Sequence, residues 1–308
     1  MGAVMLDDDW AVDRRRRAIF AGDLFVFSPK PAALAMAELA RRLLEEAFAP
    51  FEPTDAQHHM PVDAYAATLA TVKPRFIHHP DCKSLIPQLM QELGADLRDV
   101  YFDVPRLRSA TAHSYLTSGI AYAFHPHRDT WYSAPQAQIN WWFPVYEIER
   151  DNCLALYQQQ FSEILPNSSE TYNYYRWNQT GRTLASAQIG DDTRVQPRLT
   201  ADVSLGPELR LVVPVGSLIV FSGHQLHETV PNSTDVTRFS IDFRTVHRSD
   251  LVDGVGAPSG DVHCTGTTLR DFHRCTDMAP LDAELVARYD DESALEYAEG
   301  LVFTPSEN

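Results

Sequence analysis

The segment GSLIVFSGHQLH, residues 216–227, is followed closely by RFSIDFR, residues 238–244. The first is an apolar run with histidines at its end, as expected of a buried strand that delivers polar side chains at one edge of a sheet. The second alternates between polar and apolar side chains, so as a strand it has one polar and one apolar face. These two segments predict a barrel or sandwich whose interior is partly polar.

Other short β-rich runs surround these segments at irregular spacing. They cover residues 112–124, 136–145, 153–157, 210–221 and 238–246, a pattern typical of a β-sandwich or barrel. Residues 1–100 read instead as a helical scaffold, with helical periodicity from Pro31 to Pro50 and again over 83–93. The sequence predicts a mainly β fold with flanking helices, in a single domain of residues 1–308.

Two segments accompany the predicted core of residues 101–248. Residues 158–200 are polar and aromatic and interrupt the strand series, so they form either a lid over a site or a surface excursion packed by its own rings. Residues 249–308 combine loop positions with a helical patch at 281–289. We expect this extension to belong to the same domain, with packing across a dimer interface as one option; the oligomeric state stays open.

The composition limits the classes of partner. The 308 residues carry a formal net charge of -16 and a pI near 5.1, so the surface lacks the positive charge that nucleic acids and anionic membranes require. No window approaches the ~20 apolar residues that cross a bilayer. The basic run 14–17 differs from a twin-arginine export signal because Asp23 interrupts the segment after it. We expect a cytoplasmic protein that acts on a small molecule.

The chain contains two H-x-D triplets, His127-Arg128-Asp129 and His79-Pro80-Asp81. Residues two apart on an extended strand point to the same side, so one imidazole and one carboxylate can reach a single ion. The second triplet abuts a predicted helix start, where Asp81 would serve as the N-cap. We therefore expect the first triplet, which lies in the β-rich region, to be the functional one.

A distal histidine would complete a metal site. His224 and His227 both end the apolar strand, and the spacing to Arg238 favours His227. With His127 and Asp129 it makes the set of two histidines and one carboxylate that leaves three positions open on iron(II). Two of these positions suit a bidentate 2-oxo acid and one suits O2.

The last strand adds a candidate carboxylate clamp. Arg238 offers a planar fork that grips a carboxylate, and Ser240 can add a hydrogen bond to the same group. An interior lined by these residues together with Asp242 and Arg244 is costly unless a ligand or partner charges compensate it, and a dicarboxylate would serve. The alternative is an edge strand with its charges towards solvent.

This ordered set resembles the phytanoyl-CoA dioxygenase-like family of the iron(II)/2-oxoglutarate-dependent oxygenases: an H-x-D triplet, an apolar strand with a glycine turn, a distal histidine, and Arg-x-Ser eleven residues later. The resemblance implies a double-stranded β-helix (jelly-roll, cupin-like) core. It also implies catalytic iron(II) on His127, Asp129 and His227, 2-oxoglutarate held by Arg238 and Ser240, and O2 as the oxidant.

The activity implied by the resemblance is oxidation of an unactivated C–H bond, with 2-oxoglutarate decarboxylated to succinate. The carboxylate of Asp129 argues for hydroxylation, desaturation or cyclisation, because halogenases of this superfamily lack it. Residues 151–160 depart from the family's pattern where substrate contacts usually arise, so acyl-CoA is not carried over. We expect an amino-acid-like substrate or a natural-product intermediate, free or carrier-bound.

Further side chains are assigned by strand direction. Asn140 is expected to hydrogen-bond 2-oxoglutarate or substrate, Arg108 or Arg244 to pair with a substrate carboxylate, and Trp131 to wall the pocket. The alternatives are structural or surface charges for the arginines and a packing role for the tryptophan. Two rival functions are a metal cupin enzyme that does not use 2-oxoglutarate and a non-catalytic carboxylate-binding barrel.

Overall fold

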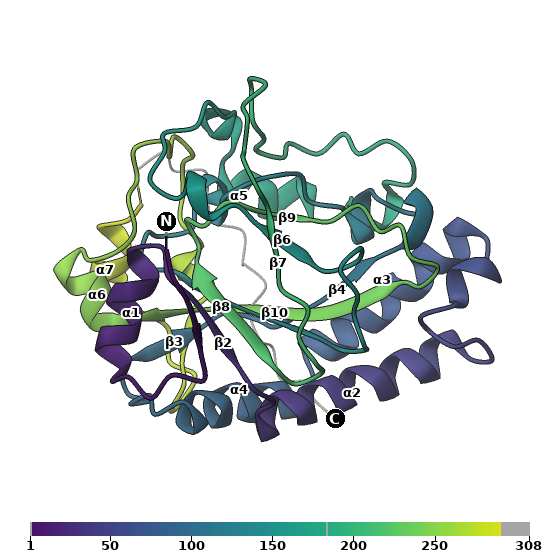
Figure 1. Cartoon of the computed structure of the whole chain (residues 1–308), viewed down its shortest axis with the longest axis horizontal. Helices are drawn as coiled ribbons and strands as arrows, with labels where there is room; N and C mark the ends of the chain where they lie inside the picture. Colours follow the sequence, from purple (N-terminus) through teal and green to yellow (C-terminus); the bar gives the residue numbers. More distant parts are fainter. Residues whose placement is uncertain (1, 183, 291–308) are drawn as a thin grey trace.

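Two β-sheets pack against each other in the computed structural model, which describes residues 2–182 and 184–290 (Figure 1). The larger sheet contains β1 (Val4–Leu6), β2 (Leu24–Phe27), β3 (Val100–Phe102), β4 (Arg106–Ala110), β5 (Ile139–Pro144), β8 (Leu218–Ser222), β10 (Arg238–His247) and β11 (His273–Arg274). Its order is β1-β2-β8-β5-β10-β3-β11, with β4 also paired to β10. The smaller sheet has the strand order β7 (Leu209–Arg210), β6 (Leu154–Leu156), β9 (His227–Thr229).

Helices cover the face of the larger sheet that points away from the smaller sheet (Figure 1). The described α-helices are α1 (Val12–Phe20), α2 (Pro31–Phe48), α3 (Val62–Ile77), α4 (Pro80–Glu92), α5 (Tyr174–Arg176), α6 (Arg248–Asp253) and α7 (Ala283–Ala287). In α2, apolar residues recur every three or four positions and Pro31 occupies its first turn. This apolar stripe joins α3, α4 and the sheet in one core.

Strand β10 separates the two faces of the larger sheet residue by residue. Phe239, Ile241 and Phe243 are fully buried in the core that includes the helices. Arg238 and Ser240 are buried on the opposite face, towards the smaller sheet. The alternation therefore produces a partly polar interior, as the sequence predicted.

A second apolar core limits how far this polar interior extends. Ile219 and Phe221 of β8 and Trp142 of β5 pack with Leu154 and Leu156 of β6. These side chains fill part of the space between the two sheets. The remaining space is lined by polar residues of β10 and its neighbours and by aromatic rings.

The sequence predicted two of the three long helices, α2 and α4, but not α3. The first spans Pro31–Phe48, and the second begins at Pro80, three residues earlier than predicted. The N-cap of this helix is His79 and not Asp81: the His79 Nδ1 atom accepts a hydrogen bond from the Asp81 backbone N–H. The second H-x-D triplet thus has a structural role at a helix start.

The strands were predicted less evenly. Residues 136–145, 153–157 and 238–246 contain β5, β6 and β10, whereas 210–221 divides into β7 and β8. Residues 112–124 form no strand; they contain the 3-10 turns η2 (Ala112–Ser114) and η3 (Gly119–Ala121). Positive φ angles at His113, Ser114 and Gly119 break the extended chain there.

The predicted helical scaffold also supplies strands. The short apolar segment of β2 pairs antiparallel with β8, with Phe25 opposite Val220. Such a short run does not distinguish a buried strand from a helix by periodicity. The mainly β character with flanking helices is confirmed. The N-terminal third, however, supplies strands of the larger sheet as well as the helices that cover it.

The described part of the predicted lid includes α5 in the upper part of Figure 1, and the described part of the extension contains α6, β11 and α7 beside α1 and β3. Residues 158–200 contain several short helices, and Tyr172, Tyr174 and Trp177 line the cavity described below. The helical patch predicted at 281–289 contains α7. Residues 291–308 of the predicted extension lie outside the described residues. No helix of residues 2–182 and 184–290 has the length and apolar character needed to cross a membrane.

Candidate metal centre

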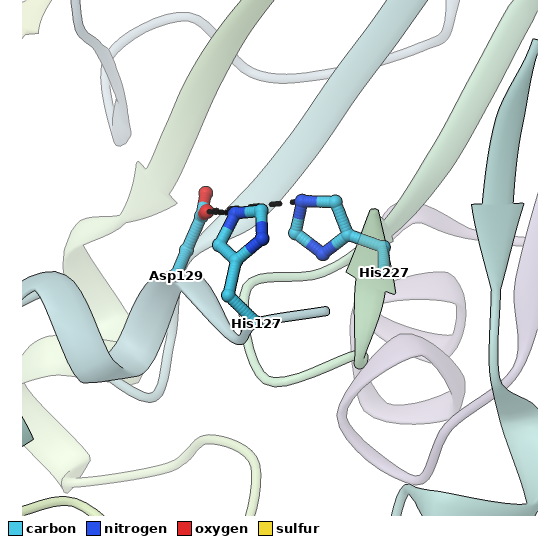
Figure 2. A group of neighbouring side chains, drawn as sticks. All are labelled: His127, Asp129 and His227. Atoms are coloured by element: carbon cyan, nitrogen blue, oxygen red, sulfur yellow. Dashed lines mark ion pairs between the residues drawn. The ribbon is translucent and has the colours of Figure 1, made fainter. Parts of the chain in front are cut away.

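His127, Asp129 and His227 place three donor atoms within 4.8 Å of one another, and all three residues are buried (Figure 2). His227 begins β9, and its backbone pairs with that of His127 through two hydrogen bonds of 3.0 Å. Asp129 begins the 3-10 helix η4 (Asp129–Tyr132). Arg128 between them is extended, so the side chains of His127 and Asp129 reach the same point.

The rings of His127 and His227 are oriented by the same kind of contact. In each ring Nδ1 lies 2.8 Å from a backbone carbonyl oxygen, that of His125 for the first and of Gln225 for the second. A carbonyl oxygen only accepts, so each Nδ1 carries the hydrogen and each Nε2 keeps its lone pair. The two Nε2 atoms lie 3.5 and 3.9 Å from Asp129 Oδ1.

This donor set fits a divalent transition metal. Adjacent ligands with bond lengths of ~2.1 Å lie about 3 Å apart, so small side-chain shifts would close the three atoms around an ion. Burial, with His127 next in effect, lowers the pKa of His227 to about 4, so the ring is neutral and able to coordinate at neutral pH. Two imidazoles and one carboxylate are the set typical of non-haem iron(II).

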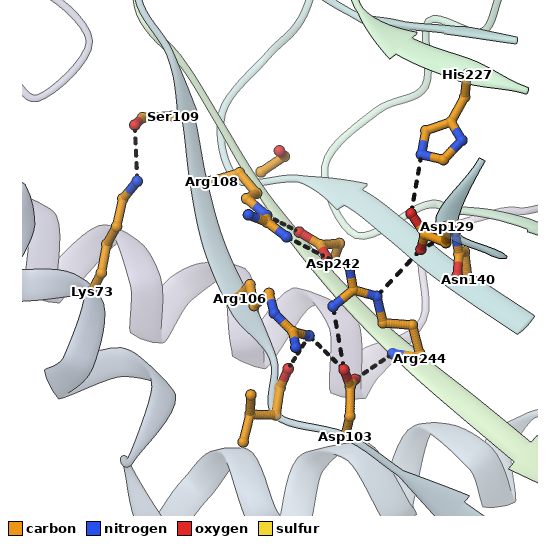
Figure 3. A network of polar contacts seen from close by, with 12 residues as sticks. Lys73, Asp103, Arg106, Arg108, Ser109, Asp129, Asn140, His227, Asp242 and Arg244 are labelled. Carbon is orange, nitrogen blue, oxygen red and sulfur yellow. Dashed lines mark hydrogen bonds and ion pairs between the residues drawn. The ribbon is translucent and has the colours of Figure 1, made fainter. Parts of the chain in front are cut away.

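The second oxygen of Asp129 is held by donors from β5 and β10 (Figure 3) and by a donor from the segment before β5. Gln138 Nε2 and Asn140 Nδ2 donate to Oδ2 at 3.0 and 2.9 Å. Arg244 Nε lies 3.5 Å from the same oxygen. Burial alone would raise the pKa of Asp129, but the charge of the Arg244 guanidinium holds it well below its usual range. Asp129 is therefore an anion with Oδ1 facing the histidines.

The metal centre opens on a cavity of about 410 Å³ that Arg238 also lines. Arg238 is 5% exposed, its Nη1 donates to Ser240 Oγ at 2.8 Å, and its Nε has no hydrogen-bond partner among the described residues. Its guanidinium forms no ion pair with a carboxylate of residues 2–182 or 184–290. Burial lowers the pKa of Arg238 to about 10, so the group is still charged at neutral pH. Within the described part of the chain, this buried cation in the cavity thus has no counter-ion.

The side chains predicted to contact 2-oxoglutarate or substrate already have partners within the protein. Asn140 is engaged with Asp129, and its Oδ1 accepts from Gln138 Nε2 at 2.9 Å. Arg108 and Arg244 line the cavity, but each is ion-paired with Asp242, at 2.5 and 3.5 Å. Both arginines therefore already have a protein carboxylate as partner, and their roles towards substrate stay predictions.

Trp131 and His224 lie away from the cavity, which corrects the prediction that Trp131 walls it. The 3-10 turn after Asp129 directs Trp131 into a separate core cluster, where it is fully buried. Tyr132 lines the cavity instead. His224 Nε2 lies 2.8 Å from Arg128 Nη1, so its lone pair accepts a hydrogen bond there and is not directed at the other ligands.

Sequence reasoning missed several contributors to this site, among them Tyr132 and Lys73. Tyr132 was not considered, although it directly follows Trp131 in the triplet's own segment. Lys73 of α3 also lines the cavity. The signal that could have revealed it is a lysine that follows the apolar residues Leu69 and Val72 in a helical segment, but α3 itself was not predicted.

No family model and no curated protein matches the chain. Similar solved structures include EvdO2 from Micromonospora carbonacea var. aurantiaca, with a TM-score of 0.44, 14% identity and coverage of 80% of this chain and 94% of that chain. The epimerase SnoN in complex with Fe3+, alpha ketoglutarate and nogalamycin RO has a TM-score of 0.40 and 16% identity, over 88% of this chain and 96% of that chain. The non-heme monooxygenase ThoJ has a TM-score of 0.38 and 16% identity, over 70% of each chain.

SnoN is described as a non-heme alpha ketoglutarate dependent epimerase from nogalamycin biosynthesis, and ThoJ as a non-heme monooxygenase. EvdO2 also has a structure in complex with 2-oxoglutarate. At these TM-scores and identities, the likeness assigns neither an activity nor a substrate to this chain. The phytanoyl-CoA dioxygenase-like branch stays a prediction.

Proposed function

We propose that this chain is an iron(II)- and 2-oxoglutarate-dependent oxygenase that oxidises an unactivated C–H bond of a small molecule. His127 Nε2, His227 Nε2 and Asp129 Oδ1 would hold the iron. Arg238 and Ser240 would hold the distal carboxylate of 2-oxoglutarate. The support is the chemistry of the donor set together with the charge of the cavity.

The observation that carries the proposal is Arg238, a buried cation in the same cavity as the metal donors. An uncompensated buried charge costs several kcal/mol, so such a group is retained where a ligand supplies the opposite charge. A bidentate carboxylate matches the guanidinium fork, and Ser240 Oγ lies 2.8 Å from Nη1, within reach of the same carboxylate. A 2-oxo diacid can bind the metal at one end and Arg238 at the other.

In this proposal the residues of the chain bind the metal and 2-oxoglutarate, orient the substrate and shield the metal centre from water. Iron(II) and 2-oxoglutarate, when bound, would supply the oxidising chemistry, in which O2 oxidises the C–H bond and converts 2-oxoglutarate to succinate and CO2. Asp129 and the two histidines present their ligand atoms from one side, which leaves the cavity side free. The rings of Phe124, Tyr132 and Phe221 line the cavity and contact the rings of His127 and His227, so they would shield the metal centre from water.

Finer parts of the proposal follow from the same geometry. Two sheets packed around the donor residues support a double-stranded β-helix core. A cavity of about 410 Å³ suits a small molecule, such as an amino-acid-like compound or a natural-product intermediate. Hydroxylation, desaturation and cyclisation all begin with attack on the same C–H bond, and the carboxylate of Asp129 is compatible with each.

Each rival function leaves one feature of the cavity unexplained. A cupin enzyme that does not use a 2-oxo acid has no need of a buried, unpaired Arg238. A carboxylate-binding barrel without catalysis has no need of three converging metal donors. The oxygenase uses both features.

The test is formation of succinate. The protein is incubated with iron(II), ascorbate, O2 and 2-oxoglutarate, and succinate is measured by mass spectrometry. We expect slow formation of succinate that requires iron, is lost in His227→Ala and Arg238→Ala, and persists in Arg98→Ala, which alters an exposed ion pair only. If the folded wild type bound metal but formed no succinate, the oxygenase proposal would be wrong and the cupin or binding function would be preferred.

A further inference from the structure

The cavity lining is rich in positive charge although the chain is acidic. Seven lysines and arginines and four aspartates line the cavity, against a net charge of -16 for the whole chain. Several of the arginines are neutralised by ion pairs: Arg106 with Asp103, Arg108 with Asp242, Arg194 with Asp192, and Arg244 with Asp103. An excess of positive charge is left after these pairs are formed.

Lys73 is part of this excess. Its Nζ donates to Ser109 Oγ at 3.2 Å and to the carbonyl oxygen of Ile120 at 2.5 Å, both uncharged partners. Among the described residues, Lys73 forms no ion pair with a carboxylate. Burial, with Arg108 next in effect, lowers the pKa of Lys73 to about 7. An anion bound beside Lys73 would oppose this lowering of the pKa and favour the charged amine.

Lys73 marks the end of the cavity remote from the iron ligands. In Figure 3 the Lys73 side chain reaches Ser109 on one side of β4, whereas Arg108 and Asp242 lie on the other side. Among the described strands β4 pairs only with β10, so its other edge is open. Around that edge the cavity lining continues with Pro74 and Ile77 of α3 and with η3.

Aromatic rings line the cavity between the lid and the metal. Phe124 stacks on His127 with ring centroids 5.0 Å apart and contacts Tyr122 at 4.9 Å. Tyr132 contacts Tyr172 of the predicted lid at 5.1 Å. All of these residues belong to the cavity lining. The site therefore combines an apolar aromatic wall with a cation at its far end.

We propose that Lys73 binds an anionic group, a carboxylate or a phosphate, on the organic substrate. This inference rests on the proposed oxygenase function. The anionic group lies at the α3 end, and the carbon to be oxidised lies at the metal end against the aromatic wall. Arg238 does not serve this purpose, because it is occupied by 2-oxoglutarate, and Arg108 is neutralised by Asp242.

The test compares charged probes with a neutral one of the same shape. The protein is loaded with iron(II) and 2-oxoglutarate under anaerobic conditions. Binding of 3-phenylpropanoate, 2-phenylethyl phosphate and 3-phenylpropanamide is then measured by titration calorimetry. We expect at least one anion to bind the wild type roughly tenfold or more tightly than the amide, the usual scale of a charge-assisted hydrogen bond. The probe that binds better distinguishes a carboxylate from a phosphate substrate.

Variants then assign this preference to Lys73. The chain has three lysines, Lys30, Lys73 and Lys83, so Lys30→Met is a matched control. Lys73→Met should abolish the preference for the anion, Lys73→Arg should keep most of it, and Lys30→Met should leave it unchanged. Equal binding of anion and amide by the wild type would overturn the inference, as would a preference that survives in folded Lys73→Met.

Measuring the affinity for 2-oxoglutarate shows whether a negative result contradicts the role of Lys73 or the proposed oxygenase function. Lys73→Met should bind 2-oxoglutarate as the wild type does. If it loses 2-oxoglutarate binding, Lys73 belongs to the 2-oxoglutarate site and the inference is wrong, although the oxygenase function stands. If the wild type binds no 2-oxoglutarate, the proposed function fails, whatever the probes do.

Discussion

Asp129 uses its two oxygens for two purposes. Oδ1 faces the Nε2 atoms of both histidines, whereas Oδ2 receives hydrogen bonds from Gln138 and Asn140. A carboxylate held in this way offers one oxygen to a metal and cannot turn to offer both. Contacts of this kind behind a metal ligand set its orientation and basicity.

Replacement of Asn140 by leucine should weaken iron binding. The variant removes a hydrogen bond of 2.9 Å to Asp129 Oδ2 and leaves the three ligands in place. We expect the Kd for iron(II) to rise about 10- to 100-fold, the usual effect of such a loss. Anaerobic competition with a colorimetric chelator measures it, with Gln88→Leu on the exposed side of α4 as the control. An unchanged Kd would show that Asn140 does not position Asp129.

The ligand residues could be predicted from sequence, but several of their neighbours could not. The H-x-D spacing and the sequence spacing from His227 to Arg238 are local patterns that can be read from the sequence without knowing how the strands are arranged. The direction of Trp131 depended on whether the chain stays extended after Asp129, and the turn η4 decided it. Lys73 reaches the cavity from a helix 54 residues earlier in the chain than His127, which no local pattern reveals.

A buried ion pair holds the segment of the metal ligands, residues 127–129, to the C-terminal part of the chain. Arg128, between the two ligands of the triplet, pairs with Asp261 at 2.6 Å, and both side chains are 1% exposed. Asp261 Oδ2 also accepts from the Leu165 backbone N–H. Arg128 in addition donates to the carbonyl oxygen of Glu163 at 3.0 Å. The triplet, the start of the predicted lid and the extension thus meet at one buried charge pair.

Asp261→Asn should strongly destabilise the protein. The change leaves Arg128 buried without a counter-charge, which typically costs ~3–5 kcal/mol. Urea unfolding followed by circular dichroism measures the loss. Glu46→Gln removes an exposed ion pair with Arg75 and is expected to have little effect. Equal stability of both variants would mean that the buried pair does not hold these segments together.

The elements that could be predicted are those with a clear period. Strand β10 and helix α2 alternate or repeat over many residues, and both were found with nearly correct bounds. Strand β4 was missed because its five residues, RLRSA, are mostly polar, and their strand form depends on pairing with β10. The order of strands around the site depends on such long-range pairings, which the sequence does not display.

At the scale of the whole molecule, a metal bound only by the folded chain should stabilise it. His127 and Asp129 lie 100 and 98 residues before His227 in the chain, so unfolding separates these two residues from His227. At a free metal concentration of a hundred times Kd, linkage predicts about 2.7 kcal/mol of added stability. Differential scanning calorimetry under anaerobic conditions should show a higher Tm with iron(II) and its reversal by EDTA. The variant His227→Ala should show no shift, and a wild type without a shift would argue against a folded metal site.

The most direct test of the central claim is an anaerobic titration of the metal-free protein with iron(II) and 2-oxoglutarate, followed by visible absorption. A 2-oxo acid chelated to iron(II) in the predicted site should produce a weak charge-transfer band that needs both components. The band should be lost in His227→Ala and appear only at much higher 2-oxoglutarate concentration in Arg238→Ala. A folded wild type that binds iron but gives no band would contradict the assignment of the cavity to iron and 2-oxoglutarate.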